Sequence, residues 1–183
     1  MKMLKLKDLI VLALLIAMEI ILSRVFSIEL LIIKISFAFL PIAFAAMLFG
    51  PIWAGVAAAL GDFLGFFLFP HPSGTAFFPG FTLTALLIGV VYGLFLYKGH
   101  VSLIKDIIRI SIAAFIVTFI LQLGLDTLWI QILTGTDYIV LLKMRIVRSA
   151  IMLPIQILLI SLIMASKQLF PANHEATIDE EHE

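Results

Sequence analysis

Long apolar segments, each about as long as a membrane-spanning helix, constrain this chain more than any other feature. Of its 183 residues, 63% are hydrophobic and only 13% are charged, and the mean hydropathy is +1.20. Soluble domains carry about 25% charged residues. Because a helix needs about 20 mainly apolar residues to cross the hydrocarbon core of a bilayer, the sequence predicts an all-α integral membrane protein.

Breaks at polar clusters and at Gly or Pro divide the chain into six predicted transmembrane helices. They lie at residues 9–26, 35–49, 52–69, 79–97, 106–133 and 140–166. The sequence FGP at residues 49–51 joins the second closely to the third, so these two are expected to form an antiparallel hairpin. Residues 1–171 are predicted to form the transmembrane domain. Residues 172–183, which are acidic and contain no Lys or Arg, are predicted to be a disordered tail.

The distribution of basic residues predicts the orientation. One side of the predicted bundle carries Lys2, Lys5, Lys7, Lys98, Lys105, Arg109 and Lys167. The positive-inside rule makes that side cytoplasmic, so we expect a multi-pass cell-membrane protein with both termini in the cytoplasm. The outer side still holds five cations, namely Arg24, Lys34, Lys143, Arg145 and Arg148. Such a concentration on the outer side needs an explanation.

Three predicted helices carry polar and aromatic residues at helical spacing, where ionisable groups usually face a bundle interior or a cavity. The stripes are Asp62, Phe66 and Phe69; Thr118, Gln122, Asp126 and Trp129; and Arg145, Arg148, Met152 and Gln156. With Arg24 and Lys34 they predict a cationic cluster at the outer end, above aromatic rings and two carboxylates. Such a site suits an extended ligand with an anionic outer end and an aromatic, hydrogen-bond-donating inner end.

Structural roles also remain open for these residues. Asp126 and Gln122 fit an interhelical hydrogen bond, and Arg145 and Arg148 fit interfacial anchors whose charged ends reach the headgroups. Glu19 lies four residues before Ser23 on the same helical face, and a structural hydrogen bond is its expected role.

Three segments together resemble a known family. They are ILSR at residues 21–24, ALGDFLG at 59–65 and FFPGFTLTALLIG at 77–89. The chain resembles, over roughly residues 8–168, the folate-binding substrate (S) subunits of energy-coupling factor (ECF) vitamin transporters. This resemblance implies an S-component-like bundle of six transmembrane helices that captures folate outside the cell. Delivery inward would require a transmembrane T subunit and two cytoplasmic ATPases.

The resemblance also implies which residues act. The outer loops would cover the pocket, with Phe77 and Phe78 stacked on a flat ring, Gly80 allowing close backbone approach, and Thr82 and Thr84 supplying hydroxyls. The expected substrate-binding residues are Arg24, Lys34, Asp62, Phe66, Phe69, His71, Phe77, Phe78, Phe81, Thr82, Arg145 and Arg148. Ala13 and Ala17, in ALLIA, would dock the T subunit. Ala85, Gly89 and Gly93 are expected to form a face for close helix packing.

ATP hydrolysis is assigned to the partners. The chain has no G-x-x-x-x-G-K-[ST] motif, and we expect no enzymatic activity, cofactor, metal or nucleic-acid partner. The nearest alternative is an S subunit for another vitamin or a queuosine-like base, although a neutral ligand would not need the outer cations. An intramembrane enzyme with a metal on Asp62 and Asp126 is a second alternative, which the lack of D-x-x-D or H-E-x-x-H spacing disfavours. A structural scaffold subunit is the third.

Overall fold

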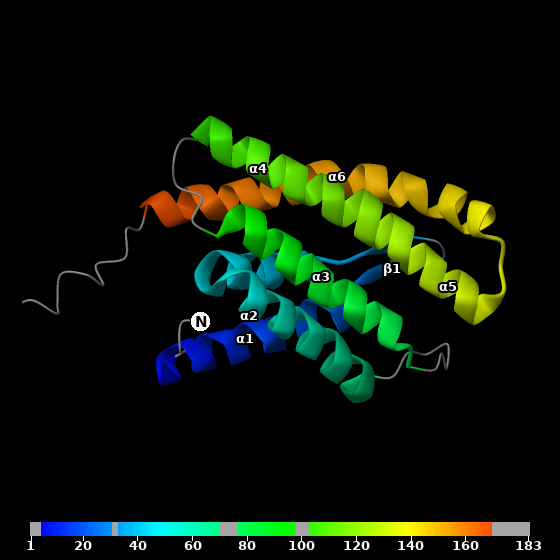
Figure 1. The fold of residues 1–183 in the computed structure, drawn as a ribbon, viewed down its shortest axis with the longest axis horizontal. Helices are drawn as coiled ribbons and strands as arrows, with labels where there is room; N and C mark the ends of the chain where they lie inside the picture. Colours follow the sequence, from blue (N-terminus) through cyan, green and yellow to red (C-terminus); the bar gives the residue numbers. More distant parts are fainter. Residues whose placement is uncertain (1–4, 31–32, 70–76, 98–102, 170–183) are drawn as a thin grey trace, which may run out of the picture.

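The computed structural model describes residues 5–30, 33–69, 77–97 and 103–169. Within them it forms an elongated helical bundle (Figure 1). The helices are α1 (Leu6–Arg24), α2 (Phe39–Leu68), α3 (Pro79–Leu96), α4 (Leu103–Phe115), the π-helix η1 (Ile116–Leu125), α5 (Asp126–Thr134) and α6 (Tyr138–Leu169). A short hairpin of β1 (Ile28–Leu30) and β2 (Ile33–Ile35) follows α1. The predicted helical membrane-type fold is confirmed apart from this hairpin.

The structure corrects the predicted boundary between the first two helices. The second helix was expected to begin at residue 35, but residues 33–35 pair in antiparallel register with residues 28–30, with Glu29 opposite Lys34. The helix therefore begins only at Phe39. Side chains of residues 28–35 lie outside what the structure describes.

A break at Gly50 divides α2 into the two predicted arms. Gly50 has φ 82° and ψ −175°, a backbone conformation that residues other than glycine rarely adopt. Pro51 follows and begins the second arm, where its missing N–H needs no partner. The two arms run in opposite directions along the bundle (Figure 1). The antiparallel hairpin predicted from FGP is therefore present, as one element with a sharp reversal.

The second arm of α2 packs closely against α3 through small residues. A Cβ added at Gly89 would overlap the backbone carbonyl of Ala54, and one added at Gly93 would overlap the backbone of Pro51. Two helices can approach this closely only where side chains are absent or very small. The predicted packing face of α3 is confirmed, and this contact fixes α2 and α3 relative to each other.

The predicted fifth helix is continuous but not uniformly α-helical. It runs through α4, η1 and α5, and the ten residues of η1 form a π-helix. A π-helix has i→i+5 hydrogen bonds and a wider turn than an α-helix. It therefore shifts which side chains after residue 115 face the bundle. Within the described residues, four helical segments are long and apolar enough to cross a membrane: 39–68, 79–96, 105–134 and 138–164.

One end of the bundle gathers the elements that carry the predicted site (Figure 1). There the C-terminal ends of α1, α2 and α5 meet the N-terminal ends of α3 and α6, next to the β-hairpin. We call this the hairpin end. The start of α1 and the end of α6 lie at the opposite end of the bundle.

The close contact between α2 and α3 generates a stability prediction. Gly89→Ala should destabilise the protein by about 1–3 kcal/mol, because the added methyl group meets backbone that cannot easily yield. Gly124→Ala is the matched control, since its Cβ would meet only the Phe119 carbonyl at 3.6 Å. Thermal unfolding in detergent should show a lower melting temperature for Gly89→Ala alone. Equal melting of the two variants would mean that the helices separate without cost.

Candidate functional site

Side chains from α1, α2 and α3 meet around Asp62 at the hairpin end. Nη2 of Arg24 lies 3.6 Å from Oδ1 of Asp62. The hydroxyl of Thr82 donates a hydrogen bond to Oδ2 of the same carboxylate, at 2.9 Å. The two charged side chains are 13% and 26% exposed, respectively. The structure therefore brings together three of the residues predicted for the site, from three different helices.

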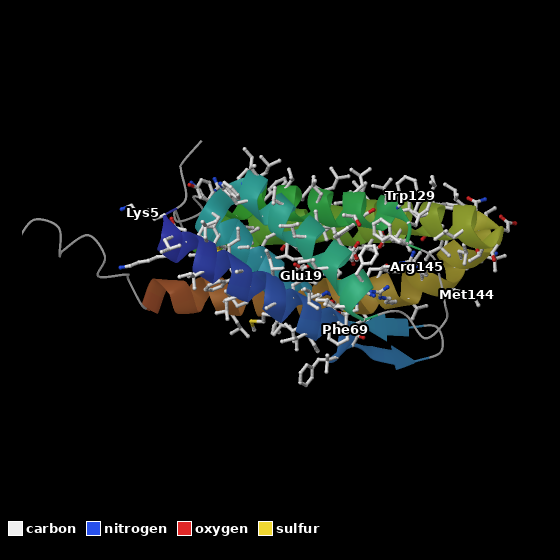
Figure 2. All side chains as sticks on the ribbon, turned by 90° about the horizontal axis from the view of Figure 1, so that it is seen from below. Lys5, Glu19, Phe69, Trp129, Met144 and Arg145 are labelled. Carbon is white, nitrogen blue, oxygen red and sulfur yellow. The ribbon has the colours of Figure 1, made fainter. Side chains whose placement is uncertain are left out.

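A second polar cluster joins α3, α5 and α6. Nη1 of Arg145 donates to the hydroxyl of Thr127 at 3.0 Å, and its Nη2 lies 3.9 Å from Oδ2 of Asp126. The indole N–H of Trp129 donates to the hydroxyl of Thr84, also at 3.0 Å. Figure 2 shows Trp129 and Arg145 in the same part of the bundle. Asp126 thus pairs with an arginine of α6 and lies next to Thr84 of α3, so an interhelical structural role for Asp126 remains open beside a binding role.

The first turns of α3 join the two clusters into one site. Thr82 bonds to Asp62 in the first cluster. Thr84, two residues later, accepts from Trp129 and lies next to Asp126 in the second. Asp62 and Asp126 are also close enough to repel each other electrostatically. Any ligand between them would therefore contact both clusters.

The arginines of this site have unused hydrogen-bonding capacity. A guanidinium carries five N–H donors. Arg24 makes no hydrogen bond to a described residue, its Nε is buried without a partner, and 3.6 Å is too long for a hydrogen bond to Asp62. Arg148 interacts electrostatically with Arg145 and Asp126 but forms no hydrogen bond within the described chain. The site can therefore bind an anionic group through charge-assisted hydrogen bonds.

Phe77 and Phe78 were expected to act together, but the structure separates them. The ring of Phe77 lies 5.3–5.7 Å, centroid to centroid, from those of Phe63, Phe66 and Phe67 on α2. Phe66, also predicted to bind the substrate, packs in this aromatic cluster. The Phe77 ring therefore packs on the end of α2 and anchors the start of α3.

Phe78 instead faces the polar site. Its ring lies 5.6 Å from that of Trp129 and 6.1 Å from that of Phe81. A Cβ at Gly80 would meet the rings of Phe78 and Trp129, so the close approach expected at this glycine is present. Trp129 was recognised in a polar stripe but was not among the predicted binding residues. Phe78, Phe81 and Trp129 form the aromatic wall next to both clusters.

Three other predicted residues are not joined to the clusters by a described contact. Phe69 follows α2, is 43% exposed and forms no ring contact with a described aromatic residue. Figure 2 shows it near the β-hairpin. Lys34 lies in β2, and its side chain is not described. His71 and most of the loop expected to cover the pocket, residues 70–76, lie outside the described residues.

Deeper in the bundle, Gln156 links three helices. Its Oε1 accepts hydrogen bonds from Tyr92 of α3 at 3.2 Å and from Thr118 of η1 at 3.0 Å. All three side chains are buried. The sequence placed Thr118 and Gln156 on inward faces but missed Tyr92 and Thr127. Regular 3.6-residue spacing could not reveal Thr127, because the π-helical η1 shifts the phase before it.

The two alanines expected to dock a partner lie on an open face of α1. Ala13 and Ala17 are exposed, whereas Leu12 and Leu15 of the same helix are buried in the core. Leu14 and Met18, next to the alanines, are also exposed. The described residues leave this face uncovered, so it is available to lipid or to another helix.

Comparisons with known proteins agree on one family. The sequence model described as "ECF transporter, substrate-specific component" matches residues 7–164. The protein named folate transporter FolT of Clostridium novyi (strain NT) is 42% identical over 85% of this chain and 87% of its own length. A folate transporter FolT of Leuconostoc mesenteroides is 30% identical over 82% of this chain and 80% of its own length. A crystal structure titled FolT bound with folic acid matches with a TM-score of 0.76 and 34% identity, over 85% of this chain and 91% of that one.

The separation of the two phenylalanines can be tested without ligand. Phe77→Ala should lower the melting temperature, because each aromatic pair is worth about 0.5–1.5 kcal/mol beyond the area it buries and Phe77 forms three such pairs. Phe69→Ala is the matched control, since Phe69 is exposed and forms no such pair with a described residue. Thermal unfolding of both variants checks this. If Phe77→Ala had the same melting temperature as the wild type, the anchoring role of Phe77 would be wrong.

Proposed function

We propose that this chain, which belongs to the ECF transporter family of substrate-specific components, binds folate at the hairpin end and delivers it into the cell. The two relatives are named as folate transporters, and the matching solved structure is titled with folic acid. The observation that carries the proposal is the pair of arginines, Arg24 and Arg145, whose donors are mostly unused. An anionic ligand would satisfy them.

Folate has the chemistry that this arrangement can recognise. Its glutamate carries two carboxylates, for which Arg24, Lys34, Arg145 and Arg148 are the proposed partners. Its pterin offers an amino group and a ring N–H, which Asp62 and Thr82 could hold. The flat rings fit the aromatic wall of Phe78, Phe81 and Trp129. His71 stays a proposed contact from the outer loop. Phe66, Phe69 and Phe77 would then support the site from α2 and the start of α3.

The proposed topology has six membrane crossings. The two arms of α2 count separately, together with α1, α3, the continuous helix from α4 to α5, and α6. Both the start of α1 and the end of α6 lie opposite the hairpin end (Figure 1), which supports a cytoplasmic location for both termini. The hairpin end would then face outward, where folate is captured.

Transport would require partners. The family is a transporter component, and this chain has no phosphate-binding loop for ATP. We propose that a transmembrane T subunit docks on the face of α1 that contains Ala13 and Ala17, and that two cytoplasmic ATPases supply the energy. Small side chains would allow a partner helix to approach closely.

A substrate component for a different vitamin or for a queuosine-like base is the competing function. It would share the fold and the partners, so only the ligand distinguishes it. A neutral base would leave the arginine donors unused. Binding of folate in preference to a neutral base would favour the proposal.

The charge clamp gives a binding prediction. Arg24→Ala and Arg145→Ala should each weaken folate binding about 10- to 100-fold, because a hydrogen bond to a charged group is worth about 1.5–3 kcal/mol. The melting temperature without ligand should change little, because both ion pairs are loose and the Asp62 and Asp126 side chains are 26% and 20% exposed, so water can solvate the carboxylates. Arg109→Ala, an exposed residue of α4, is the control and should bind like the wild type. Titration calorimetry measures all three.

The same variants identify which end of the ligand the arginines hold. Pteroate lacks the glutamate, so both variants should bind it about as well as the wild type does. Equal folate binding by the wild type and both arginine variants would remove the proposed clamp.

The docking face gives a transport prediction. Ala13→Trp and Ala17→Trp should abolish folate uptake in cells that supply the T subunit and ATPases, because a large ring holds two helices apart. Folate binding by the purified variants should be unchanged. Leu94→Trp, at an exposed position of α3, is the matched control and should transport normally. Loss of binding together with transport would instead assign the two alanines to packing within the bundle.

A further inference from the structure

Glu19 is a buried carboxylate that the site described so far does not use. It lies on α1 between the two ends of the bundle (Figure 2) and is 6% exposed. Ser23, four residues later on the same face, donates to the carbonyl of Ile20 in its own helix and not to Glu19. Glu19 forms no hydrogen bond to a described residue. A buried carboxylate normally has a partner.

The surface of α2 is shaped to receive this carboxylate and Arg24. A Cβ added at Gly61 would overlap the carboxylate of Glu19, and one added at Gly65 would lie 3.3 Å from Nε of Arg24. The two glycines are four residues apart, so they lie on the same face of α2. Small residues at this spacing usually let two helix backbones approach. Here the space holds an acidic and a basic side chain.

Arg24 lies within reach of two carboxylates. Helical side chains point toward the N-terminus of their helix, so Arg24 extends back along α1 toward Glu19. Glu19 interacts electrostatically with both Arg24 and Asp62. The existing ion pair to Asp62 is loose at 3.6 Å, and Nε of Arg24 has no partner. The guanidinium is therefore not committed to Asp62 by strong hydrogen bonds.

We propose that Glu19 is a positioning residue for ligand binding, which takes over the ion pair with Arg24 when the ligand engages Asp62. The inference rests on the proposed function, in which the pterin donors bind that carboxylate. A ligand whose donors occupy Asp62 weakens the hold of that carboxylate on Arg24, so a second carboxylate is needed to keep the guanidinium in place for the anionic group of the ligand. Glu19 keeps Arg24 neutralised and held beside the bound ligand.

The first test neutralises the carboxylate without changing its volume. Glu19→Gln should weaken folate binding about tenfold or more, because Arg24 then has no second carboxylate when the ligand occupies Asp62. Without ligand, this variant should melt at the same temperature as the wild type or higher, since the ion pair between Arg24 and Asp62 is intact. Asp137→Asn, which neutralises an exposed acid beyond α5 at the same end, should bind folate normally.

The second test needs no ligand. In Asp62→Asn the loose ion pair is lost, so Arg24 should pair with Glu19 in the empty protein. Adding Glu19→Gln should then lower the melting temperature, although the same change in the wild type does not. This non-additivity is the signature of a shared arginine. If the wild type failed to bind folate, the proposed function would fail, and this arm would still decide whether Glu19 pairs with Arg24.

Two results would overturn the inference. Folate binding by Glu19→Gln equal to that of the wild type would show that Glu19 does not support the ligand-bound site. An equal loss of melting temperature in the wild-type and Asp62→Asn backgrounds would make Glu19 a packing residue that does not depend on Arg24.

Discussion

Charges held inside a helical bundle must be neutralised, and the hairpin end depends on this constraint. Arg24, Arg145 and Arg148 enter from α1 and α6, and the acids Glu19, Asp62 and Asp126 enter from α1, α2 and α5. Yet the two ion pairs are loose, at 3.6 and 3.9 Å. Charge is therefore balanced while hydrogen bonding is incomplete. A site in this state gains most from a ligand that supplies both acceptors and donors.

The scaffold that holds these charges is rigid where the ligand must be oriented. Glycines bring α3 against the second arm of α2 with backbone contact, which fixes Asp62 relative to Thr82 and Thr84. Gln156 ties α3 to η1 and α6 deeper in the bundle. The guanidinium groups of the arginines, in contrast, are carried by longer and less constrained side chains than those of Asp62, Thr82 and Thr84. A fixed floor with movable cations suits a ligand whose anionic end varies in position more than its ring.

The helices could be predicted from the sequence because apolar length and Gly or Pro breaks determine them directly. The predicted helix at 79–97 is α3 at Pro79–Leu96, and FGP marks the reversal in α2. The β-hairpin was missed because its strands are only three residues long, too short for an alternating pattern to be recognised, so residue 35 looked like the start of a helix. The π-helix leaves no mark in composition, although it decides that Thr127 and not Asp126 is fully buried.

The structure brings the charged residues predicted for the site together more closely than the predicted aromatic residues. Arg24, Asp62, Thr82 and Arg145 fall at one end because helical phase and depth place them there. Phe77 and Phe78 could not be separated by phase, since Phe78 has extended backbone at the start of α3 and adjacent residues in such backbone point to opposite sides. Long-range pairings such as Gln156 with Tyr92 depend on how the helices pack, which no local pattern encodes.

The most direct test of the central claim is the identity of the small molecule that the protein carries. The purified protein, produced in cells that contain folate, would be denatured and the released molecule identified by mass spectrometry. A cationic site whose arginines have unused hydrogen-bond donors predicts folate in an amount equimolar with the protein. A neutral base in its place, or no ligand together with no binding of added folate, would contradict the account.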